Sequence, residues 1–172
     1  MPIVLSLFSL SPCLLFAQKI EVEKRISPEE APALIHQFLE REYSEKSKVK
    51  FYEEQNESGR FFEAKFCFQK ARYSVKFNPE GQLVDTERQI RYKEIPAEAA
   101  GQIEKQLKGQ FQRHKVVRTQ EVLENGQAVG YELEIKGKRE VELGYFEGQF
   151  DSEGRQQSLR TIEQPPNDFL FF

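Results

Sequence analysis

Residues 61–90 read FFEAKFCFQKARYSVKFNPEGQLVDTERQI, and this stretch decides the expected fold. Apolar and polar side chains alternate on both sides of residues 69–71, which predicts two antiparallel strands joined by a tight turn. Residues 78–81 (NPEG) predict a second turn, in which Gly81 can adopt a positive φ, and residues 83–90 predict one more strand. The side chains expected to point toward the core are Phe62, Ala64, Phe66, Phe68, Tyr73, Val75 and Phe77.

The segment before this stretch predicts a helix and a further strand. Residues 27–30 (SPEE) have the features of a helix start, because Ser27 can cap, Pro28 suits the first helical position and Glu30 completes a capping box. Apolar residues then recur at helical spacing up to Tyr43. The alternation around Phe51 predicts a strand. Residues 18–90 therefore predict one helix followed by a four-stranded antiparallel meander.

The second half of the chain shows the same order of signals. Pro96 opens an apolar pattern at helical spacing, and three alternating segments follow, separated by turn residues at 124–126, 136–138 and 151–154. Corresponding positions lie at a nearly constant offset, as tandem copies predict. The expected fold class is α+β: a tandem repeat of one helix plus a four-stranded antiparallel meander, with the helices on one face of the sheet. The expected repeats are residues 18–90 and 91–172.

Residues 1–17 differ in composition from the rest of the chain. Residues 3–17 contain no charged side chain and are shorter than the about 20 apolar residues that a membrane-spanning helix needs. We interpret residues 1–17 as a signal peptide cleaved near Ala17 or Gln18, although no Lys or Arg precedes the apolar run. A buried N-terminal strand or helix is one alternative, and lipidation at Cys13 is a lesser one. The expected location is periplasmic or secreted.

The charge of the chain is nearly balanced. Lys and Arg number 25 and Asp and Glu 28, which gives a net charge of -3, and both halves are evenly mixed. Nucleic-acid binding usually requires a basic surplus, so this class of function is not expected. No membrane span is expected after residue 17. The expected partner is a protein or peptide of unknown identity, and the expected state is a monomer.

The supply of catalytic and metal-binding side chains is small. The sequence contains 2 His, at positions 36 and 114, and no Gly-rich phosphate-binding loop. His36 and Glu40 lie one helical turn apart and could share a metal ion, but two ligands rarely suffice. Once the signal peptide is removed, Cys67 is the only thiol, which leaves no intramolecular disulfide. We therefore expect no catalytic residues, no metal site and no cofactor, and the protein is not expected to be an enzyme.

Four segments together resemble the PepSY-like family of secreted bacterial proteins, which look like the β-lactamase inhibitor protein in fold. They are residues 61–66 (FFEAKF), 73–77 (YSVKF), 78–87 (NPEGQLVDTE) and 90–96 (IRYKEIP). The resemblance covers nearly all of the mature chain. Two positions depart from the family pattern: Asn78 replaces the usual Asp, and Phe51 replaces a tryptophan.

The resemblance implies two helix-plus-sheet repeats, a location outside the cytoplasm, and binding or inhibition of another protein such as a peptidase. It provides no catalytic residues to transfer. The implied function is an exported, non-enzymatic protein-binding module that inhibits or modulates an extracytoplasmic peptidase or other enzyme. The alternative is an envelope protein that binds a small ligand or a metal.

Strand alternation identifies the candidate partner-binding residues. If one face of the sheet packs on the helices, the other face is open to a partner. The simpler interpretation is that alternating charges on this face only keep an open sheet hydrated. The candidates on the open face are Phe61, Glu63, Lys65, Ser74, Lys76, Glu132, Glu134 and Lys136.

Overall fold

The structure is a computed structural model that describes residues 22–56 and 58–163. The expected signal peptide, its cleavage site and Cys13 lie outside the described residues. Within the described ranges, no helix combines the length and the apolar character needed to cross a membrane.

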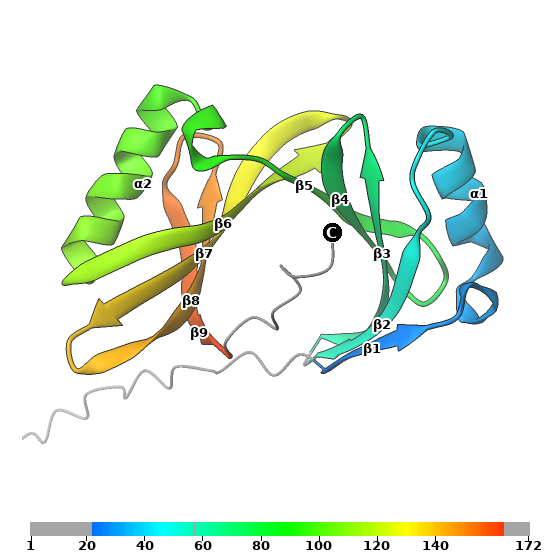
Figure 1. The fold of residues 1–172 in the computed structure, drawn as a ribbon, viewed down its shortest axis with the longest axis horizontal. Helices are drawn as coiled ribbons and strands as arrows, with labels where there is room; N and C mark the ends of the chain where they lie inside the picture. The colour runs from blue at the N-terminus through cyan, green and yellow to red at the C-terminus, as the bar shows by residue number, and fades with distance from the viewer. Residues whose placement is uncertain (1–21, 57, 164–172) are drawn as a thin grey trace, which may run out of the picture.

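Nine antiparallel strands form a single sheet, and two α-helices and two short 3₁₀ turns interrupt the strand sequence (Figure 1). The strand order in the sheet is the order in the chain, so each strand pairs with its sequence neighbours. The elements are β1 (Val22–Ile26), η1 (Pro28–Glu30), α1 (Ala33–Glu42), β2 (Lys50–Asn56), β3 (Gly59–Phe68), β4 (Ala71–Phe77), β5 (Leu83–Gln89), η2 (Tyr92–Glu94), α2 (Ala97–Gln110), β6 (Arg113–Glu124), β7 (Gln127–Arg139), β8 (Glu142–Asp151) and β9 (Gln156–Ile162).

The expected fold class, α+β with a tandem helix-plus-four-strand repeat, is wrong. One continuous sheet dominates the described chain, and the helices span only 10 and 14 residues. Strand β5 pairs with β6 over four residue pairs, from Thr86 with Leu123 to Gln89 with Gln120. This pairing covers an edge that would otherwise expose backbone N–H and C=O groups, and local alternation cannot reveal it because it joins distant segments.

The first helix begins later than the sequence predicts. Ser27 and Glu30 form the expected capping box, in which the Ser27 backbone N–H donates to the Glu30 carboxylate at 2.7 Å. The capped element is only the 3₁₀ turn η1, because Pro32 forces the preceding residue Ala31 into an extended conformation with ψ 139°. Helix α1 starts anew at Ala33.

The sheet is strongly curved, and both helices lie on its outer, convex side (Figure 1). Two separate cores form there: α1 packs on β2, β3 and β4, and α2 packs on β7 and β8. Between the two cores the convex face carries an ion pair between Arg88 and Glu121. Bulges near Phe77, Val117, Leu123 and Phe150 interrupt the strand pairing, and such irregularities bend strands locally. Among residues 22–56 and 58–163, no helix lies on the concave face.

Candidate functional site

All eight predicted binding residues lie on the concave face. On β3, Phe62, Ala64 and Phe66 are buried in the first core, so the residues between them point the opposite way. The same alternation applies around Val75 and Phe77 on β4, and around the buried residues of β7. The residues thereby placed on the concave face are Phe61, Glu63, Lys65, Ser74, Lys76, Glu132, Glu134 and Lys136.

In the first half of the concave face, the charged side chains are joined to one another. The Lys65 ammonium lies 2.7 Å from Glu23 and 2.9 Å from Glu63, and the Ser74 hydroxyl donates to Glu63. Although burial favours the neutral amine, the Glu63 and Glu23 carboxylates raise the pKa of Lys65 above its usual value. Lys65 therefore stays charged, and it contacts two carboxylates at once.

A second lysine on this face is held in a similar way. The Lys76 ammonium lies 2.9 Å from Glu54, whose side chain is buried. Burial lowers the pKa of Lys76, but the Glu54 carboxylate outweighs this effect and the net pKa is raised.

The second half of the concave face carries comparable pairs. Arg118 lies 2.6 Å from Glu134, and Arg160 pairs with Glu147. Glu134 is only 6% exposed, and burial raises its pKa in spite of the Arg118 guanidinium. The charge of Lys65, on the other half of the sheet, also acts on Glu134 and lowers its pKa. The curvature therefore brings charges of both halves within electrostatic reach of each other.

Glu87 lies near the middle of the concave face, on β5. Burial raises its pKa well above the ordinary value of 4.5, and the carboxylates of Glu132, Asp85 and Glu63 raise it further. The Gln120 side-chain amide donates a hydrogen bond to the Glu87 carboxyl group. An ionised Glu87 is therefore costly in the folded protein.

Replacing Glu87 with glutamine is expected to stabilise the protein at pH 7. A carboxyl group whose pKa is raised by folding makes the protein less stable as the pH rises above the unfolded pKa, near 4.5, toward the folded pKa. Glutamine cannot ionise and still accepts from Gln120, so the urea midpoint should rise at pH 7 and match that of the unmodified chain near pH 4. The control is Glu45→Gln, at an exposed position between α1 and β2. If the urea midpoints of Glu87→Gln and the unmodified chain differed by the same amount at pH 7 and pH 4, the raised pKa of Glu87 would be contradicted.

Aromatic rings accompany the lysines of this face. The Lys65 Nζ atom lies 4.7 Å from the ring centre of Tyr52, and Lys136 Nζ lies 5.5 Å from that of Tyr145. Lys76 Nζ lies 5.9 Å from the ring centre of Phe61. Such contacts are cation–π interactions, and aromatic rings supply large contact areas at protein interfaces.

Sequence reasoning missed several groups that complete this face. Arg118 was missed because a bulge at Val117 shifts the alternation of β6 and places Arg118 opposite Glu134, on the concave face. Glu54 and Glu147 looked like ordinary solvated carboxylates, although both are buried beside a cation. Strand register is the signal that would have found them, because Glu54 opposes the predicted residue Phe61 and Glu147 opposes Glu134.

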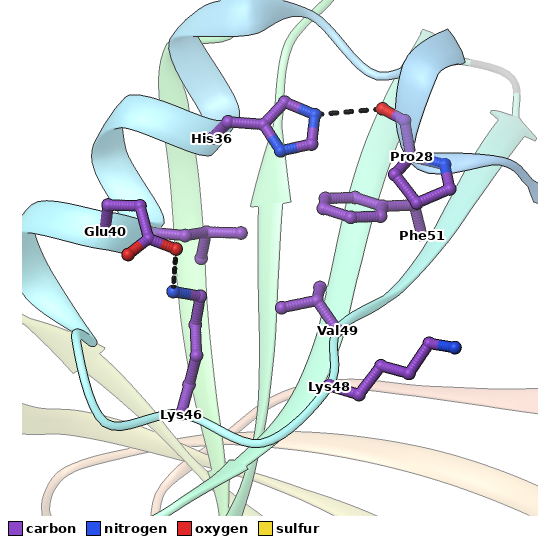
Figure 2. A pocket seen from close by; sticks show the side chains of 8 residues that line it. Pro28, His36, Glu40, Lys46, Lys48, Val49 and Phe51 are labelled. Atoms are coloured by element: carbon purple, nitrogen blue, oxygen red, sulfur yellow. Dashed lines mark hydrogen bonds and ion pairs between the residues drawn. The ribbon is translucent and has the colours of Figure 1, made fainter.

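A shallow hollow beside α1 contains His36 and Glu40, the two residues that the sequence offers as metal ligands (Figure 2). It measures about 190 Å³, below the roughly 300–1,000 Å³ typical of ligand pockets. His36 Nε2 donates to the Pro28 carbonyl at 2.9 Å, and Glu40 pairs with Lys46 at 2.5 Å, so both potential metal ligands already have protein partners. Across residues 22–56 and 58–163, no three His, Cys, Asp or Glu side chains are grouped to hold a metal ion.

No protein-family model matches this sequence, and neither does any curated protein. Solved structures do match. A Bacteroides eggerthii protein whose description proposes a periplasmic location has a TM-score of 0.61 at 16% identity, covering 81% of this chain and 94% of that one. A DUF2874 family protein from Bacteroides uniformis has a TM-score of 0.58 at 18% identity, covering 76% and 89%.

A BLIP-like protein from Bacteroides fragilis has a TM-score of 0.56 at 12% identity, covering 79% of this chain and 89% of that one. Identities this low establish similarity of fold alone. The PepSY-like assignment made from the sequence motifs stays a prediction. The chain has the fold of this group of Bacteroides proteins, which includes a BLIP-like member.

Proposed function

We propose that this protein works outside the cytoplasm as a non-enzymatic module that binds another protein through its concave face. The observation that carries the proposal is the construction of this face. No helix of the described chain covers it, charged and aromatic side chains from both halves line it, and its charges make mutual contacts such as Lys65 with Glu23 and Arg118 with Glu134. A surface that is already ordered loses little conformational entropy when a partner binds.

The location outside the cytoplasm is supported by the composition of residues 1–17 and by the description of the Bacteroides eggerthii protein of the same fold. Inhibition or modulation of an extracytoplasmic enzyme, with a peptidase as the first candidate, is the more specific form of the proposal. The PepSY-like motifs and the BLIP-like fold support it. An inference from similarity of fold is an analogy, and it supports the proposal less strongly than the side chains of the concave face do.

A capture experiment with paired variants tests the proposal. Residues 18–172 are immobilised as bait in an extracytoplasmic extract of the source organism, and captured proteins are quantified by mass spectrometry. The test variant is Phe61→Ala with Glu132→Gln, which removes a ring and a charge from the concave face. We expect at least tenfold less of the captured partner, because truncating an interface anchor commonly costs about 2 kcal/mol or more.

The control variant makes the same kinds of change on the convex side. It is Leu34→Ala with Glu98→Gln, where Leu34 is 53% exposed on α1 and Glu98 is exposed on α2. It should capture the partner as the unmodified bait does, and circular dichroism should show all three baits folded. A partner lost with the control and kept with the test variant would overturn the concave-face assignment. A captured partner with enzyme activity is then assayed with and without the bait.

A further inference from the structure

One corner of the concave face differs from the rest because its positive charges have no negative partners among residues 22–56 and 58–163. Register places Lys115 of β6 directly opposite Lys136 of β7, and Arg113 directly opposite Lys138. All four side chains are exposed. Within the described part of the chain, no carboxylate forms an ion pair with any of them, whereas Lys65, Lys76, Arg118 and Arg160 on the same face are all paired.

The four charges are close together by strand geometry. Residues opposite each other on antiparallel strands have Cβ atoms about 5 Å apart. Each opposed pair forms one row across the strands, and the row of Lys115 and Lys136 lies about 7 Å from the row of Arg113 and Lys138. Like charges directly opposite each other destabilise a sheet unless a counter-charge neutralises them. The arrangement is therefore complementary to a negatively charged group.

On β8, apolar side chains lie next to the two pairs of cations. Tyr145 lies opposite Lys136, and Leu143 lies opposite Lys138. Leu143 is 71% exposed, so its side chain is available for contact with a partner. We call the six residues Arg113, Lys115, Lys136, Lys138, Leu143 and Tyr145 the basic corner. It offers cations on β6 and β7 beside an apolar strip on β8.

We propose that the basic corner binds an acidic segment of a protein partner, one in which glutamate or aspartate side chains accompany an apolar residue. The inference rests on the proposed function, because it specifies the chemistry of the partner that the concave face receives. The carboxylates would pair with the two cation rows, and the apolar residue would lie on Leu143 and Tyr145.

Two other kinds of polyanion fit the corner less well. An anionic membrane would have to receive the β7–β8 turn, where Val141 is 94% exposed but is flanked by the exposed carboxylates of Glu140 and Glu142. A nucleic acid would contact a longer track of cations, and the net charge of the chain is -3. The strip of apolar surface beside the cations favours a peptide.

Binding of a defined peptide tests the inference. The probe is a fluorescein-labelled peptide Glu-Leu-Glu-Glu-Phe-Glu, compared by fluorescence anisotropy with the same peptide carrying glutamine in place of glutamate. We expect the acidic peptide to bind at least tenfold more tightly than the glutamine peptide in low salt, and to weaken as ionic strength rises. The variant Lys115→Gln with Lys136→Gln should weaken binding of the acidic peptide at least fivefold.

The matched control, Lys93→Gln with Lys105→Gln, removes the same charge from exposed positions of η2 and α2 and should bind as the unmodified chain does. Equal binding by both double variants would overturn the inference, as would no binding of the acidic peptide in low salt. Tighter binding of phosphatidylglycerol vesicles or of a DNA duplex than of the peptide would also overturn it. Capture that depends on Phe61 and Glu132 without any acidic-peptide binding would reject the basic corner and leave the proposed function standing.

Discussion

Replacing Phe77 with alanine is expected to lower the free energy of unfolding by about 3–5 kcal/mol. Phe77 is fully buried, lies opposite Phe62 in the sheet, and meets the ring of Phe38 from α1 edge-on at 5.4 Å between ring centres. Alanine would leave a cavity between sheet and helix, because the pairing of Phe77 with Phe62 fixes its strand beside β3 and α1 covers the site from the other side. Urea denaturation followed by circular dichroism measures the loss.

Phe61→Ala provides the matched control for this prediction. It is the same chemical change on an adjacent strand, but Phe61 is half-buried on the concave face, away from α1 and α2. We expect a distinctly smaller loss of stability than for Phe77→Ala. Equal losses at the two positions would mean that the concave face is packed like the core, which would contradict the account of an open face.

Replacing Gly154 with alanine is expected to lower the free energy of unfolding by about 2–5 kcal/mol. Gly154 has φ +79°, a conformation that costs other residues about 1–2 kcal/mol. A Cβ atom here would also lie 2.3 Å from the carbonyl oxygen of Ala99 in α2, and such overpacking typically costs about 1–3 kcal/mol. The helix is fixed against this turn because the Gln106 side chain donates to the Gly154 carbonyl at 2.7 Å.

Gly126→Ala separates the two contributions. Gly126 has φ +77°, almost the same as Gly154, but a Cβ atom added there would have no other atom within 4 Å outside its chain neighbours. Its replacement should lower the free energy of unfolding only by the about 1–2 kcal/mol that the positive φ costs an alanine. Unfolding midpoints in urea compare the two variants directly. If both glycines cost the same, the close contact between α2 and the β8–β9 turn would be wrong.

Local patterns in the sequence predicted the strands and their faces. The alternation at Phe62, Ala64 and Phe66 correctly separated core from open side chains, because the side-chain period of a strand is two. The turn signal at Asn125 and Gly126 likewise matches two residues with positive φ. These features depend only on neighbouring residues, so a single sequence contains them.

Long-range pairing could not be predicted from those patterns. The contact between β5 and β6 joins segments separated by η2 and α2, so its residue pairs and its register could not be read from local alternation. Glu54 and Glu134 are buried beside cations of other strands, Lys76 of β4 and Arg118 of β6, and these contacts join residues distant in the sequence. The prediction that the first helix starts at residues 27–30 did not take Pro32 into account. Helix α1 therefore starts later than predicted, at Ala33.

The basic corner was hidden for a similar reason. Lys136 was assigned to the open face from its own strand alone, but Lys115 and Arg113 became its neighbours only through the register of β6 with β7. The balanced charge of the whole chain conceals this local surplus of cations. The net charge argues against nucleic-acid binding by the chain as a whole, but it does not describe any one part of the surface.

Hydroxyl-radical footprinting of the complex with a captured partner tests the central claim most directly, because it reports the solvent access of individual side chains. Tyr52, Phe61 and Tyr145 report on the concave face, and Leu34 and Phe38 report on α1 at the convex side. The partner is expected to lower oxidation of the three concave residues and to leave oxidation of the two residues of α1 unchanged. Protection of Leu34 and Phe38 with unchanged oxidation of the concave rings would contradict it.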